Sequence, residues 1–233
     1  MSTLTVYPDA GTGTTCDAKL VASNVTWAGA RAATTANFSA STTDATIYIE
    51  GDATGGVNYL GRPMFTWDTS ALTAGATISA AVVSLYATGT DDTSEIVNPA
   101  DPTFVTATPA APGSLVAEDF DQVGSTSLCD SPPTLATFAG STGYHDFTLN
   151  ATGIAAVSKT GITQLAVRPL NDINNAAPTL RSYASFSTAD TGGTTQDPKL
   201  VVTYTLTSTF VPKIIITMMA IITALGAATA VIG

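Results

Sequence analysis

Short runs in which apolar and polar residues alternate recur along the first 206 residues of the chain. A clear example is 45–50, Ala-Thr-Ile-Tyr-Ile-Glu, which stops at Gly51. Because side chains along a strand point alternately to opposite faces, each run predicts a strand with one buried face. The predicted strands are near 4–6, 45–50, 62–67, 77–86, 103–106, 144–149, 163–168 and 199–205. Many short strands separated by Pro, Gly, Asn and Asp are typical of a mainly β, antiparallel sandwich or barrel.

One segment, 151–161, departs from this alternation. Ile154 and Val157 lie one helical turn apart, and the segment closes on Lys159 followed by Gly161, a common signal for the end of a helix. We therefore expect a single short helix at the rim of the sandwich. No internal repeat is visible, so 1–206 is predicted to be one domain.

The last twenty residues follow Lys213 and carry no charge. As a helix they would be about 30 Å long, which matches the hydrocarbon core of a bilayer. We predict a linker at 207–212 and a separate hydrophobic helix at 213–233. A strand added to the sheet of a neighbouring molecule is an alternative for the first part of this segment, because that part is rich in isoleucine.

Small residues recur every four positions in the predicted C-terminal helix, as at Ala220, Ala224 and Ala228. This spacing lets helix backbones approach closely, so we expect the helix to pack against copies of itself first and against lipid second. The residues expected to make the contact are Ile214, Thr217, Met218, Ala220, Ile221, Ala224, Leu225 and Ala228.

The composition narrows the function classes. The 233 residues include 18 Asp and Glu against 8 Lys and Arg, a net charge of −10, which argues against nucleic acid as a partner. Only 11% of the residues are charged, and Thr, Ser, Ala and Gly take their place, as in many extracellular and virion proteins. The N-terminus shows neither a basic nor an apolar signal-peptide region, so we expect export by another route.

The two cysteines, Cys16 and Cys129, are too few for a zinc site, because the lone His145 supplies only one further ligand. In an extracellular protein we expect them to form one long-range disulfide, which would stabilise the fold by about 4–5 kcal/mol. The alternative is that both are reduced and buried.

Two stretches, 62–86 and 197–204, resemble the core and the closing strand of the DNRLRE-type β-sandwich family. That family is similar to carbohydrate-binding modules and occurs in microbial surface proteins, polysaccharide-degrading enzymes and phage-like structural proteins. The resemblance implies a jelly-roll-like sandwich, and the Tyr-Pro-Asp-Ala-Gly at 7–11 resembles a phage or environmental-microbe branch. It implies no binding site, because the basic-acidic string that names the family is absent here.

No set of residues satisfies the geometry of a catalytic site. His145 and Asp146 are neighbours in a predicted strand and would point to opposite faces. The acidic clusters at 118–121 and 91–95 lie in stretches rich in Gly, Ser, Thr or Pro, where solvated acids are expected. We therefore predict that the protein is not an enzyme and needs no cofactor.

Binding sites are the remaining candidates. The oxygen-rich segments 171–175 and 190–197 are candidates for structural calcium, as in related sandwiches, although neither has the EF-hand spacing. Trp27 and Tyr59 are candidate glycan contacts, whereas Trp67 shares strand parity with Phe65 and is expected in the core.

Together these patterns predict a structural subunit of an extracellular filament or virion. The sandwich would face solvent, and copies would assemble through the C-terminal helix. The alternatives are a membrane-anchored surface protein, with the same helix in lipid, and a carbohydrate-binding adhesin that recognises surface glycans.

Overall fold

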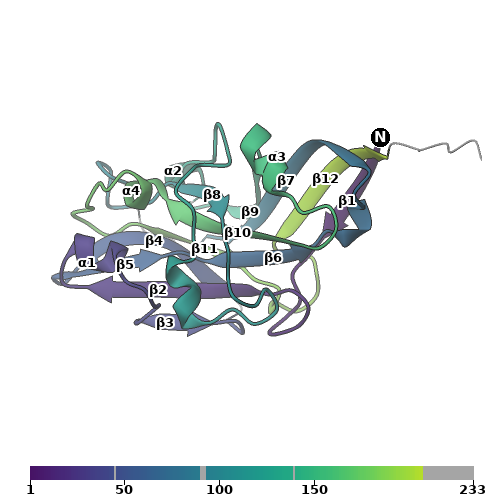
Figure 1. Ribbon diagram of the computed structural model, residues 1–233. Helices are drawn as coiled ribbons and strands as arrows, with labels where there is room; N and C mark the ends of the chain where they lie inside the picture. Colours follow the sequence, from purple (N-terminus) through teal and green to yellow (C-terminus); the bar gives the residue numbers. More distant parts are fainter. Residues whose placement is uncertain (45, 90–92, 139, 207–233) are drawn as a thin grey trace, which may run out of the picture.

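The computed structural model describes residues 1–44, 46–89, 93–138 and 140–206, and the protein is mainly β with antiparallel pairing throughout (Figure 1). The strands are β1 (Ser2–Val6), β2 (Asp17–Asn24), β3 (Ser39–Ser41), β4 (Thr46–Thr54), β5 (Val57–Gly61), β6 (Met64–Asp68), β7 (Ala76–Thr88), β8 (Pro102–Thr106), β9 (Thr142–Thr148), β10 (Ile162–Pro169), β11 (Tyr183–Ser187) and β12 (Lys199–Leu206). The helices are α1 (Trp27–Arg31), α2 (Leu135–Phe138), α3 (Ala151–Ala156) and α4 (Leu170–Ile173), with 3₁₀ turns η1 (Ser70–Leu72) and η2 (Ala117–Asp121).

The strands form two antiparallel sheets, consistent with a β-sandwich. One sheet has the order β1-β12-β7-β11-β4, and β9 pairs with the other edge of β7. The second contains β2, β6, β10 and β8. Strand β5 pairs with both β4 and β2 and so connects the two sheets along one side.

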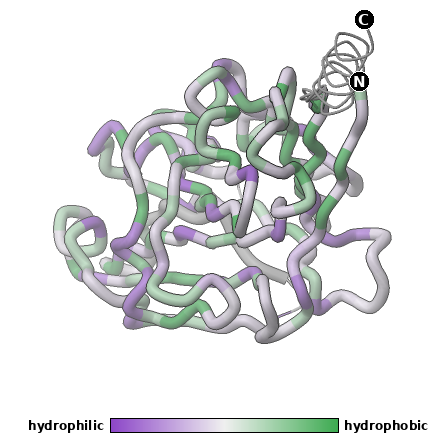
Figure 2. The backbone as a smooth tube through the Cα atoms, turned by 45° about the vertical axis from the view of Figure 1, so that its right-hand side comes forward, coloured by the Kyte–Doolittle hydropathy of each residue, from purple (hydrophilic) through white to green (hydrophobic). Residues whose placement is uncertain are grey.

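The main core lies between these sheets and is built from aromatic rings. Phe65 on β6 packs 5.7 Å from Phe186 on β11 and 6.0 Å from Phe104 on β8, measured between ring centroids. Trp67, two residues after Phe65, is fully buried and stacks on it, as strand parity predicts. Figure 2 shows hydrophobic (green) and hydrophilic (purple) residues interspersed along the described chain.

A second, smaller core cluster lies where β2 meets α1, β5 and η2. Leu20, Leu60, Met64 and Phe120 are its largest fully buried members.

The first and last described strands are neighbours. Strand β1 pairs with β12 in the register Ser2↔Tyr204 to Val6↔Leu200. The start of β1 and the end of β12 therefore lie together at one end of the molecule, and α1, β3 and β5 lie toward the opposite end (Figure 1).

The helix predicted at 151–161 is confirmed as α3, although it ends at Ala156. Its N-cap is Asn150, whose Oδ1 accepts a hydrogen bond from the Gly153 N–H at 3.0 Å. Helices α1, α2 and α4 have only four or five residues, too few for a periodic pattern, and the sequence did not predict them.

The linker at 207–212 and the C-terminal helix at 213–233, with all its expected contact residues, lie outside the described residues. Within the part of the chain that is described, no helix has the length and apolar composition needed to cross a membrane.

Candidate functional site

The two cysteines are free thiols, and the predicted disulfide between Cys16 and Cys129 is wrong. Cys16 belongs to the smaller core cluster, where its thiol donates to the carbonyl oxygen of Pro112 at 3.4 Å. Cys129 is buried in the main core between the sheets. Each thiol is packed within a different cluster, so the alternative of two reduced, buried cysteines describes this structure.

Trp27 does not present its ring to solvent. It is the first residue of α1, which Thr26 caps, and it is only 7% exposed as a member of the smaller core cluster. The expectation that Trp27 is an exposed glycan contact is therefore wrong.

Tyr59 is half-buried on β5 and packs against an aromatic residue that the sequence did not single out. Phe38 is 59% exposed, and its ring meets that of Tyr59 edge to face, with centroids 4.9 Å apart. Asn37 fixes the segment before β3 by accepting from the Ser23 N–H at 2.8 Å and donating to the Ser23 carbonyl at 3.1 Å. Ser23 is the ladder partner of Tyr59, so polar groups border the aromatic pair.

His145 and Asp146 face different partners, as their positions in one strand predict. The Nε2 of His145 lies 2.7 Å from the Ser141 hydroxyl, and its ring packs against Phe138. The Asp146 carboxylate instead accepts a hydrogen bond from the Ser84 hydroxyl at 2.6 Å. The two side chains therefore do not form a base paired with an orienting acid.

The segment 171–175 has no carboxylate available for calcium. Asp172 is fully buried and accepts hydrogen bonds from the side chains of Arg31, Arg62 and Arg168. Three guanidinium groups occupy the oxygens that a cation would need, so the calcium interpretation of this segment is wrong.

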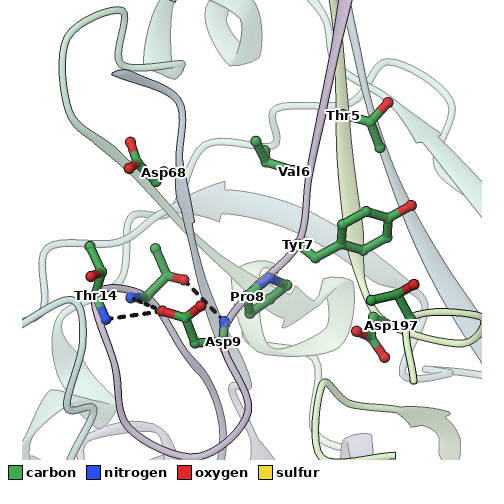
Figure 3. A pocket seen from close by; sticks show the side chains of 10 residues that line it. Thr5, Val6, Tyr7, Pro8, Asp9, Thr14, Asp68 and Asp197 are labelled. Carbon is green, nitrogen blue, oxygen red and sulfur yellow. Dashed lines mark hydrogen bonds between the residues drawn. The ribbon is translucent and has the colours of Figure 1, made fainter. Parts of the chain in front are cut away.

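An acidic hollow of about 510 Å³ lies between the N-terminal segment and the loop before β12 (Figure 3). Its lining includes three carboxylates, those of Asp9, Asp68 and Asp197, and no lysine or arginine. Thr and Tyr7 side chains supply hydroxyl groups around them. The hollow is therefore suited to a cation or to a ligand rich in hydroxyl groups.

Asp9 shapes one wall of this hollow. Its Oδ2 accepts hydrogen bonds from the N–H groups of Thr14 and Thr15, both at 3.0 Å, and the Thr15 hydroxyl accepts one from the Asp9 N–H (Figure 3). These bonds close the loop that leads into β2. The Asp9 carboxylate is thus used to hold the loop.

Asp17, Asp190 and Asp197 form an acidic cluster that adjoins the hollow. Asp17 is 1% exposed and accepts a hydrogen bond from the Ala189 N–H at 2.9 Å. Burial, followed by the charges of Asp190 and Asp197, raises the pKa of Asp17 to about 7. Burial and the charge of Asp190 likewise raise the pKa of Asp197 to about 6.

The segment 190–197 is the second calcium candidate. Its two end residues, Asp190 and Asp197, thus place their carboxylates near that of Asp17 on β2. No three His, Cys, Asp or Glu side chains within the described residues are arranged to hold a metal ion. The sequence could not predict Asp17 as a member, because it lies more than 170 residues away from Asp190 and only the fold brings them together.

Comparison with protein-family models finds no match, and no curated protein matches this sequence. The resemblance to the DNRLRE-type family therefore stays a prediction.

Proposed function

We propose that this protein is a non-enzymatic structural subunit of an extracellular filament or virion. In this proposal a jelly-roll-like sandwich of the DNRLRE type is displayed to solvent, and copies assemble through the hydrophobic segment 213–233. The membrane-anchored surface protein is the main alternative, with the same segment in lipid.

The observation that carries the proposal is where the chain leaves the sandwich. Strand β12 ends at Leu206 beside the start of β1, at one end of the molecule, seven residues before the hydrophobic segment begins. The Phe38–Tyr59 pair lies on the β2–β3–β5 part, toward the opposite end (Figure 1). A subunit that is held at one end and displays the other needs this arrangement.

Sedimentation of the full chain and of a chain ending at residue 206 tests this proposal. We expect the full chain to form large particles or filaments without lipid and the shortened chain to run as a monomer. Assembly of the shortened chain would refute the role of the segment. A full chain that is small and needs detergent would favour the membrane anchor.

Substitutions within the segment give a finer test. Replacing Ala224 and Ala228 by Ile should block close helix approach and reduce assembly, because small residues at this spacing allow backbones to meet. Ile222→Leu is the matched control, since it changes shape at a bulky position outside the expected contact residues and keeps the hydrophobicity.

Carbohydrate binding is a second candidate function, favoured by the Phe38–Tyr59 pair. An exposed ring bordered by amide and hydroxyl groups can stack on the apolar face of a sugar. The full chain would be applied to a glycan array beside Phe38→Ala and, as a control, Val25→Ala, which removes an exposed aliphatic residue. Binding that survives Val25→Ala and is lost in Phe38→Ala supports this function, and a blank array removes it.

A further inference from the structure

The acidic cluster Asp17, Asp190 and Asp197 has no counter-charge within it. The nearest lysines in sequence are engaged elsewhere: Lys19 pairs with Asp44 at 2.7 Å, and the Lys199 ammonium lies 3.8 Å from the centre of the Tyr144 ring. Three carboxylates of like charge in a poorly solvated place repel one another. Such a cluster is stable only if something neutralises it.

Two oxygens of the cluster have no hydrogen-bond partner among the described residues. These are Asp197 Oδ1 and Asp190 Oδ2, both buried at the level of the atom. Asp197 as a whole is 4% exposed and also lines the hollow of Figure 3. Buried polar atoms in folded proteins almost always have a partner, so an unpartnered carboxylate oxygen points to a missing ligand.

We propose that Asp190 and Asp197 bind one hard divalent cation of the calcium type, with Asp17 adding negative charge behind them. Because no three acidic, His or Cys side chains of the described chain surround one point, two carboxylates would contact the ion directly. Main-chain, hydroxyl and water oxygens supply the other ligands. Calcium accepts such an irregular set of oxygens, whereas magnesium requires a nearly octahedral one.

Asp190 and Asp197 both lie in the loop before β12, so the ion would fix this loop beside the start of β2, where Asp17 lies. The Asp17 carboxylate accepts a hydrogen bond from the N–H of Ala189, the residue before Asp190, at 2.9 Å. Neutralising the carboxylates at this junction would hold the loop before β12 against the start of β2. The proposal does not depend on whether the protein assembles or binds glycans.

Two aromatic residues provide a direct readout. The Tyr144 hydroxyl donates to the Asp197 carbonyl at 2.9 Å, and the Trp67 indole N–H donates to the Pro198 carbonyl at 3.5 Å. Terbium, which substitutes for calcium, should therefore emit when these rings are excited. We expect saturable terbium emission from the full chain that calcium displaces and an equal concentration of magnesium does not.

Variants locate the site. Asp197→Asn should weaken terbium and calcium binding at least tenfold, while Glu118→Gln, an exposed acid on η2, should leave it unchanged. Asp197→Asn removes one of three repelling charges, so without calcium the variant should fold at least as well as the wild type. Circular dichroism of the variant checks this. Asp190→Asn is the second variant if the first does not fold.

Calcium should also raise the unfolding temperature of the wild type and of Glu118→Gln, but not that of Asp197→Asn. The absence of saturable terbium and calcium binding by the wild type would overturn the proposal. Bound protons would then be what neutralises the three carboxylates. An equal loss in Glu118→Gln and Asp197→Asn would overturn it too, because binding would then reflect overall charge.

Discussion

Arg62 and Asp172 are 110 residues apart in the sequence and form a two-pronged ion pair in the interior. The Nε and Nη2 of Arg62 donate to the two carboxylate oxygens at 2.9 and 3.0 Å. Arg168 on β10 donates to the same carboxylate at 2.7 Å, and Arg31 on α1 donates at 3.2 Å. Burial alone would raise the pKa of Asp172, but the guanidinium groups of Arg168 and Arg62 outweigh it and lower that pKa. One carboxylate thus ties α1, β10 and α4 to the chain before β6.

Asp172→Asn should therefore destabilise the protein strongly. The substitution leaves buried arginine charge without its partner, which typically costs about 3–5 kcal/mol. Urea unfolding of the variant beside wild type measures the change. Asp121→Asn, at an exposed position, should cost less than about 1 kcal/mol. Similar small losses in both variants would contradict the central role of Asp172.

The same pair shows what the sequence could and could not predict. Alternation located most strands, and strand parity placed Trp67 in the core, because these signals are local. Asp172 looked like a loop oxygen ligand, since nothing in 171–175 reveals three arginines that only the fold brings to it. The Cys16–Cys129 pairing failed for the same reason: their packing in separate clusters is a property of the topology.

The candidate site was predicted only in part. The end residues of 190–197 suggested an ion, but Asp17 is added by tertiary contact. The sequence singled out Tyr59 alone as a candidate glycan contact. Its exposed partner Phe38 was missed, because the segment around Phe38 shows no clear alternation of apolar and polar residues. Trp27 looked exposed because polar and small residues surround it, and the short helix α1 turned it inward.

Glu95 joins two loops, and acid should release them. Its carboxylate accepts from the N–H groups of Val97, Asn98 and Leu180 at 2.8, 3.0 and 3.0 Å, and from that of Thr179. Burial opposes ionisation, but these donors outweigh it and lower the pKa of Glu95 from 4.5 to about 2. Since the folded value lies below the unfolded one, the stabilisation is complete above about pH 4.5 and is lost as pH falls toward 2.

Glu95→Gln should therefore lower stability by about 2–3 kcal/mol at pH 7, where wild type gains from charged acceptors, and by less at pH 3. Chemical unfolding at both pH values measures the difference. Glu118→Gln, an exposed glutamate, is the control and should change little at either pH. A loss for Glu95→Gln that is the same at both pH values would contradict the pKa argument.

The acidic cluster predicts the opposite pH dependence near neutrality. Asp17 binds its proton more tightly in the folded protein, with a pKa of about 7 against an ordinary value of 3.8. With a chelator present to remove divalent cations, stability should thus fall as pH rises from about 4 through 7. The reason is that the folded protein must then bury the charged Asp17 carboxylate. At pH 8 Asp17→Asn should be more stable than wild type by at least about 1 kcal/mol. Thermal unfolding across this range measures it, and an equally steep pH dependence in Asp17→Asn would assign the effect to other groups.

The free cysteines give a prediction that needs no variant. Burial raises the pKa of both thiols, so Cys16 and Cys129 should react slowly with a thiol reagent in the native state. In denaturant without reductant both should react at once, giving two thiols per chain. A reductant should leave the unfolding midpoint unchanged, whereas losing a disulfide over this span would cost about 4–5 kcal/mol. Two thiols that appear only after reduction would contradict this prediction, because both cysteines would then be oxidised in the folded protein.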